Sequence, residues 1–384
     1  MKSRRRGVLF AALLFGALLT GVYANGHLNS VEEERNARVE ICESLPEYDF
    51  ERMLSRTERI TGQQLQRNLS ICVERTDSGI DTTPNQAQFA FVEEDGLRFF
   101  ELDERESSTE RSSLGHTTVS PDGGPVEVFL ANQTVVENVP WLSYEALVVH
   151  ELSDAIGIPA ANDGTTTGSR STAPQTTDEV LARQAVSNGV SLYVADVYID
   201  RYGGHLNVSA LSAPEQQWKR QITQSMYYSG YRYSKQLDQR SVRGTDIPES
   251  TAQLLHPNET EPIDERLESP NVSTTSLERV HTDRVGELFL RETLESKGIS
   301  PSRATAATDG WTNDRMDYYR SSNATVVTWR VTWERASQAT EFVDTYAEVY
   351  DFERVSTLSP VSCDESGRYL ALSEKTVTVA GCTT

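Results

Sequence analysis

Lysine is scarce in this sequence, and positive charge is scarce in general. The 384 residues include 57 Asp or Glu against 36 Lys or Arg, which gives a formal net charge of −21. The five lysines are Lys2, Lys219, Lys235, Lys297 and Lys375. An acidic surface of this kind repels nucleic acid and anionic lipid. We therefore expect no nucleic-acid partner.

Long apolar runs are missing too, with one exception near the N-terminus. Residues 8–22 are predominantly apolar, they follow Lys2 and three arginines, and Ala24 completes a small-residue pattern typical of signal-peptide cleavage. Residues 1–24 are therefore predicted to be either a signal peptide or an uncleaved N-terminal anchor. Both alternatives predict an exported protein, extracellular or at the cell surface, with membrane contact only through this segment.

Cysteine is rare, and no two cysteines have the CxxC spacing of a zinc knuckle. An even number of cysteines in an exported chain indicates disulfides, which would leave no thiol nucleophile. Of the three possible connectivities, the local grouping favours Cys42 with Cys72 and Cys363 with Cys382. Export also makes six Asn-x-Ser/Thr sequons candidate glycosylation sites: Asn68, Asn132, Asn207, Asn258, Asn271 and Asn323.

Several catalytic signatures are absent. The sequence has no Gly-x-Ser-x-Gly nucleophile elbow, no P-loop and no Rossmann glycine fingerprint. Its many carboxylates single out no glycosidase-type pair. If the protein is a catalyst, its catalytic residues must therefore belong to a different sequence motif.

That pattern is a predicted helix over residues 143–157. At 100° per residue, His150, Glu151 and Asp154 share one arc of a helix that is otherwise largely apolar. In zinc peptidases, two histidines at i and i+4 hold Zn²⁺, and the Glu after the first polarises a water molecule. Asp154 stands where the second histidine belongs. Two interpretations remain open: a variant metal site, or a structural His150–Asp154 pair that needs no metal.

Periodicity and turn signals predict an α+β protein. Residues 25–85 favour a helical N-terminal region, because their apolar side chains recur at helical spacing. A strand hairpin is expected over 88–102, a polar loop over 103–125 and a further strand over 126–130. A capping box at 176–179 predicts a second long helix that ends at about Tyr202.

Residues 301–384 predict a small C-terminal α+β unit. Two strands are expected at 316–319 and 325–333, followed by a helix over 337–350. A terminal hairpin is expected from strands at 368–372 and 376–380.

The chain resembles a family of haloarchaeal secreted surface proteins with a core similar to the gluzincin metallopeptidases. The resemblance spans roughly residues 85–350 and rests on the order of several stretches: YEALVVHEL at 144–152, ARQAVSNG at 182–189, STAQLLHP at 250–257, RVGELFLR at 284–291 and GWTNDR at 310–315, with Trp329, Trp333 and Phe342. It implies a zincin-like domain over 86–300. Intact members pair HELxHA with a helix similar to ALVEGDA.

On that pattern His150 and Glu151 match, whereas Asp154 replaces the second histidine and Asn188 replaces the glutamate ligand. Val190 also replaces the aspartate that follows. A zinc site needs three strong ligands and an open position. We therefore predict a catalytically inactive scaffold without a cofactor, in which Glu151 has no metal-bound water to activate. Its partner would be an unidentified protein or another cell-surface component.

The alternative is a zinc-dependent hydrolase with a variant HExxD site. Zinc would then be held by His150, Asp154 and a third ligand from elsewhere in the chain. The distant histidines that could supply it are His205, His256 and His281.

Overall fold

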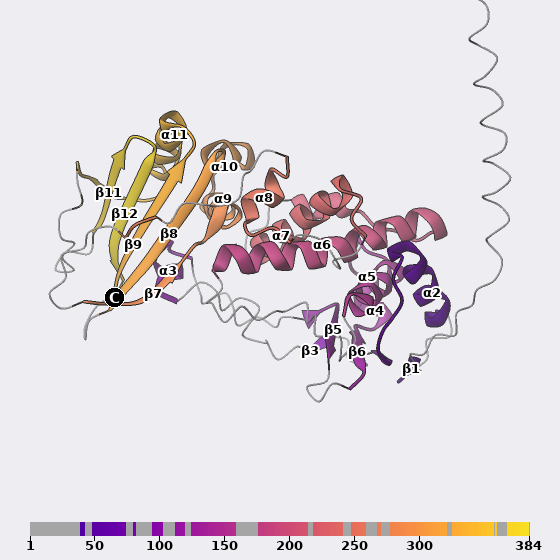
Figure 1. Cartoon of the computed structure of the whole chain (residues 1–384). Helices are drawn as coiled ribbons and strands as arrows, with labels where there is room; N and C mark the ends of the chain where they lie inside the picture. The colour runs from indigo at the N-terminus through magenta and orange to yellow at the C-terminus, as the bar shows by residue number, and fades with distance from the viewer. Residues whose placement is uncertain are drawn as a thin grey trace, which may run out of the picture.

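The protein has a mixed α+β fold. The computed structural model describes residues 39–42, 48–73, 80–81, 94–102, 112–119, 124–158, 176–213, 218–240, 247–258, 267–269, 277–320, 325–356, 358 and 367–383. Figure 1 shows a larger sheet at one end, a smaller sheet at the other, and long helices between them. The predicted signal or anchor segment, residues 1–24, lies outside the described residues. Within them, no helix is long and apolar enough to cross a membrane.

The smaller sheet has four strands, in the order β1 (Val39–Ile41), β2 (Leu69–Val73), β6 (Val126–Leu130) and β5 (Gly115–Val119). β1, β2 and β6 are parallel, and β5 runs antiparallel to β6. The strand predicted at 126–130 is confirmed. The loop predicted over 103–125 is wrong in part, because it contains β5 and also β4 (Ser112–Ser113), which pairs with β3 (Ile80–Asp81).

The prediction that residues 25–85 are helical is only partly correct. Helix α2 (Phe50–Thr61) begins at the cap residue Asp49 and ends at Gly62, which adopts a left-handed conformation. The segments that form β1 and β2 are strands where we expected helix. The reason is non-local, because β2 is held on one side by β1 and on the other by β6. The disulfide predicted between Cys42 and Cys72 is confirmed and ties the end of β1 to β2.

The strand predicted at 97–100 is wrong, because these residues belong to helix α3 (Glu94–Phe99) and the turn after it. α3 packs on the C-terminal sheet, far along the chain. The ring of Phe100 lies 5.2 Å from that of Trp329 and 5.4 Å from that of Phe289. Contacts with these distant residues help to bury Phe99 and Phe100. The apolar side chains within 97–100 are therefore buried without pairing as a strand. The other half of the expected hairpin, 89–92, lies outside the described residues.

The two helices at the centre of the molecule form as expected. Helix α5 (Tyr144–Gly157) begins at Ser143, whose hydroxyl accepts from the N–H of Ala146, and follows the short α4 (Gln133–Glu137). Helix α6 (Thr177–Tyr202) begins with the predicted capping box and ends at Gly203. α6 is followed by the 3₁₀ helix η3 (Val208–Ser212) and by α7 (Trp218–Gln236), which packs along it.

The larger sheet has six strands, in the order β10 (Glu353–Arg354), β11 (Arg368–Ser373), β12 (Thr376–Thr383), β9 (Thr325–Trp333), β8 (Trp311–Arg320) and β7 (Glu278–Asp283). All neighbours are antiparallel except β10 and β11. The strands predicted at 316–319 and 325–333 and the terminal hairpin are confirmed. The sheet begins at β7, before residue 301, where we placed the start of the C-terminal unit.

Helices lie along one face of this sheet: α9 (Gly286–Ser296), α10 (Pro301–Thr308) and α11 (Ala336–Tyr346) (Figure 1). The predicted helix over 337–350 corresponds to α11, which begins one residue earlier and ends four residues earlier. The rings of Trp333 and Phe342 lie 4.7 Å apart in this core, and Trp329 is fully buried. Trp329 and Trp333 are therefore core residues.

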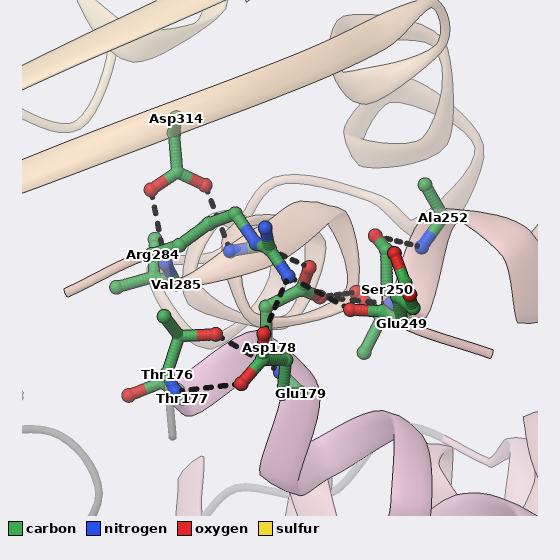
Figure 2. Close-up of polar contacts among 12 residues, drawn as sticks. Thr176, Thr177, Asp178, Glu179, Glu249, Ser250, Ala252, Arg284, Val285 and Asp314 are labelled. Atoms are coloured by element: carbon green, nitrogen blue, oxygen red, sulfur yellow. Dashed lines mark hydrogen bonds and ion pairs between the residues drawn. The ribbon is translucent and has the colours of Figure 1, made fainter. Parts of the chain in front are cut away.

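A buried carboxylate joins the start of α6 to the C-terminal part. Asp178 is fully buried; its Oδ1 accepts from the N–H (2.8 Å) and hydroxyl (2.5 Å) of Thr251, the first residue of α8 (Thr251–Leu255). Its Oδ2 accepts from Nε of Arg284 at 3.0 Å (Figure 2). Gly286 has a φ of +83°, and a Cβ there would lie 1.9 Å from Asp178 Oδ1, so this close approach requires glycine.

A second carboxylate holds the start of α9. Asp314 on β8 accepts from the N–H groups of Val285 (2.9 Å) and Gly286 (2.8 Å) (Figure 2). Burial raises the pKa of Asp314 to about 7, although both hydrogen bonds favour its ionised form. The two carboxylates together fix α6, α8 and α9 relative to the larger sheet.

The glycosylation candidates differ in exposure. Asn68, Asn207 and Asn258 are exposed, whereas Asn132 is half-buried and caps α4 by accepting from the N–H of Val135 at 3.0 Å. Modification of these four residues stays a prediction. Two further candidates, and one cysteine of the second predicted disulfide, lie outside the described residues: Asn271, Asn323 and Cys363. The pairing of that cysteine with Cys382 also stays a prediction.

Candidate functional site

Helix α5 holds the candidate residues in the interior of the protein. The helix packs on β5 and β6 on one side and against α6 on another. His150 is 9% exposed and Glu151 is 4% exposed, while Asp154 is half-buried. The three polar side chains are thus gathered on one helix, as their spacing predicts.

Asp154 lies between two partners from different helices. Its Oδ2 is 3.6 Å from Nε2 of His150, which is a contact beyond hydrogen-bond distance. Its Oδ1 accepts a 2.5 Å hydrogen bond from the hydroxyl of Ser191 on α6. The i,i+4 pair of the structural interpretation is therefore present as a contact, but the short hydrogen bond of Asp154 goes to Ser191.

Strand β5 covers Glu151. The hydroxyl of Thr117 donates to Glu151 Oε2 at 2.8 Å and lies 3.2 Å from the main-chain oxygen of the same residue. A Cβ at Gly115 would lie 2.6 Å from Glu151 Oε1, so glycine is what allows the strand to pass this close. The carboxyl group is therefore enclosed by a segment that we expected to be a loop.

Asn188 does not reach the cluster through its amide nitrogen. Its Nδ2 donates to the main-chain oxygen of Gln184 on its own helix at 2.8 Å, and the residue is half-buried. Ser191, one turn further along α6, is the residue that contacts Asp154. The ring of Tyr227 on α7 stacks on His150 with centroids 6.0 Å apart.

Sequence reasoning missed three members of this cluster, namely Ser191, Tyr227 and Thr117. A signal for Ser191 existed, because it is a polar residue inside the apolar stretch 189–195 of a predicted helix. Neither Tyr227 nor Thr117 carried a local signal. Their positions depend on how α7 and β5 pack against α5.

Burial dominates the electrostatics of the cluster. It raises the pKa of Glu151, which the nearby Asp154 carboxylate raises further, and it raises the pKa of Asp154 despite the opposing effects of His150 and Ser191. It lowers the pKa of His150, although Asp154 opposes this shift. All three shifts favour uncharged side chains, because a buried charge is costly.

The distant histidines all have other contacts. His205 Nε2 is 3.0 Å from the main-chain oxygen of Pro140, and His256 Nε2 is 3.0 Å from Oε1 of Glu287. His281 lies against the ring of Tyr318, with centroids 5.4 Å apart. Within the described ranges, no group of three or more His, Cys, Asp or Glu side chains is arranged to hold a metal ion.

The cluster also differs from a serine-hydrolase triad. In such a triad the histidine lies between serine and carboxylate, so that it can take the serine proton. Here the carboxylate of Asp154 lies between Ser191 and His150. The serine therefore donates to the carboxylate and is not activated by the histidine.

In the comparison with known proteins, only the C-terminal part of the chain matches a family model. Residues 273–383 match the family model of a domain of unknown function, DUF8575. This range contains β7 to β12 together with α9, α10 and α11. No curated protein matches the chain, and no solved structure matches it. The match coincides with the larger sheet and its helices, and it does not include α5.

Proposed function

We propose that this chain is an exported cell-surface protein in which a zincin-like core serves as a non-catalytic scaffold. Its role is structural or binding, with a protein or another cell-surface component as partner. The long helix α6 follows α5, as the pairing of HELxHA with a second helix in intact members implies, and this supports a zincin-like core. The apolar run at 8–22 supports export.

The observation that carries this proposal is the hydrogen bond from Ser191 to Asp154. Zinc needs three strong protein ligands that converge on one point. Asp154 accepts from Ser191, Glu151 accepts from Thr117, and the amide nitrogen of Asn188 donates to its own helix. Buried polar groups that satisfy one another in this way hold helices in register. The cluster thus has the features of a structural contact among α5, α6 and β5.

A second candidate is a zinc hydrolase with a variant HExxD site. The observation that favours it is the approach of His150 Nε2 to Asp154 Oδ2, 3.6 Å apart on one helix. Glu151 would polarise the zinc-bound water in that case. The third ligand would come from another part of the chain.

The two candidates differ in metal content. The whole protein is purified from the medium or cell surface, dialysed against buffer with trace zinc, and analysed by elemental mass spectrometry beside a His150→Ala variant. The scaffold proposal predicts no zinc above the His150→Ala level. About one zinc per chain that His150→Ala abolishes would overturn it.

Peptide hydrolysis and unfolding give independent readouts. We expect wild type and Glu151→Gln to be equally inactive on a mixed peptide library; activity that Glu151→Gln removes would establish the hydrolase. The scaffold proposal further predicts that Ser191→Ala lowers the free energy of unfolding by about 0.5–1.5 kcal/mol, because it removes the hydrogen bond to Oδ1 of the half-buried Asp154. Ser187→Ala, an exposed change on the same helix, is the matched control and should have little effect.

A further inference from the structure

A groove opens at the beginning of helix α5, away from the His150 cluster. Its volume is about 340 Å³, and it is bordered by α4, the first turn of α5 and the loop at 203–206. The loop is fixed in place, because the N–H of Ser143 donates to the main-chain oxygen of His205 at 2.8 Å. Leu142 and Leu206 form a β-bridge beside this bond. The groove is thus a built feature of the fold.

Two tyrosine rings form one wall of the groove. Tyr48 and Tyr144 have ring centroids 4.8 Å apart, with their planes at 40°. Tyr144 is 4% exposed, and its hydroxyl has no hydrogen-bond partner among the described residues. A buried hydroxyl without a partner is costly for the fold alone.

The rest of the lining carries negative charge. Glu137 and Glu145 both line the groove, whereas no lysine or arginine of the described chain does. Gln133 Nε2 donates to Glu137 Oε1 at 2.9 Å. Glu145 is half-buried and forms no ion pair with any described side chain. The groove therefore keeps one carboxylate without a basic partner.

We propose that this groove binds the guanidinium or ammonium group of a basic side chain presented by another protein. Aromatic faces attract cations, and carboxylates form strong charge-assisted hydrogen bonds with them. The volume is within the range of small-ligand pockets, about 300–1,000 Å³. The net charge of −21 raises the local concentration of cations at the surface. Tyr144 and His150 are about 9 Å apart along the helix axis, so this inference does not rest on the proposed function of the His150 cluster.

The test uses the whole chain and a matched pair of probes. N-acetyl-arginine methylamide and N-acetyl-citrulline methylamide have nearly the same shape, but only the first is charged. We expect saturable binding of the arginine probe by calorimetry at low ionic strength, with the citrulline probe at least about tenfold weaker. The lysine analogue tests the ammonium group. Equal binding of arginine and citrulline probes, or no saturable binding at millimolar concentration, would overturn the proposal.

Three variants locate the binding. Glu145→Gln should weaken arginine binding about fivefold. Tyr144→Phe keeps the aromatic ring and removes only the buried hydroxyl, so it should leave binding unchanged and the fold at least as stable. Glu341→Gln makes the same charge change at an exposed position on α11 and should bind as the wild type does. Equal losses in Glu145→Gln and Glu341→Gln would refute a specific site. The thermal unfolding midpoint of each variant separates lost binding from lost structure.

Discussion

Helices α6 and α7 approach so closely that an added methyl group should force them apart. A Cβ on Gly189 would lie 2.0 Å from the main-chain carbon of Gly230, and a Cβ on Gly230 would lie 1.8 Å from the main-chain oxygen of Ala185. Non-bonded carbon atoms prefer separations of about 3.5–4.0 Å. A Gly189→Ala substitution therefore requires a local displacement of about 1.5 Å.

The cost of that displacement is set by the atoms that the methyl group meets. Overpacking a core costs about 1–3 kcal/mol, and the upper end applies because the obstacle is backbone, which no rotamer change can move aside. The higher helix propensity of alanine offsets about 1 kcal/mol of this overpacking cost. We therefore expect Gly189→Ala to lower the free energy of unfolding by about 2 kcal/mol net. The displacement should also loosen the His150 cluster, because α6 carries Ser191 and α7 carries Tyr227.

Guanidinium unfolding followed by tryptophan fluorescence measures this cost. Gly157→Ala is the matched control, because Gly157 lies at the end of α5 with no atom within 4 Å of the position of an added Cβ. That variant should be as stable as the wild type or slightly more stable. If Gly189→Ala unfolds at the same denaturant concentration as Gly157→Ala, the inferred contact between α6 and α7 is wrong.

Two further predictions concern stability. The double variant Cys42→Ser/Cys72→Ser should lose about 3–4 kcal/mol in guanidinium unfolding, since the disulfide closes a chain separation of 30 residues; an unchanged midpoint would contradict this. For Asp314, burial raises the pKa from 3.8 to about 7, so the folded protein retains a proton that the unfolded chain releases between these pH values. Its contribution to the free energy of unfolding is fully present below about pH 4 and is lost as the pH rises through about 7. As the pH rises through this window, the free energy of unfolding of the wild type should fall relative to that of Asp314→Asn, and parallel curves would refute the assignment.

The sequence predicted best where the signal is local. The capping box at 176–179 and the glycine after Tyr202 defined the ends of α6, because helix ends depend on side chains within a few residues. The alternation of Val and Trp with polar residues likewise predicted β9. These signals are carried by neighbours in the chain.

The sequence failed where distant partners decide the structure. Residues 69–73 carry apolar side chains that suit either a helix or a strand, and pairing with β1 and β6 selects the strand. The apolar run at 97–100 looks like a strand, but packing of Phe100 on Trp329 and Phe289 accommodates a helix and turn. The partners in both cases lie outside the segment itself, so no periodicity within the segment predicts them.

For the candidate site, the sequence by itself determined which chemistry-bearing residues share helix α5. His150, Glu151 and Asp154 lie on one helix because their spacing is a property of the helix alone. Only the tertiary structure decided what surrounds them: Ser191 from α6, Tyr227 from α7 and Thr117 from β5. The physical reason is that burial and hydrogen bonding are set by packing between elements, whereas helical spacing is set within one.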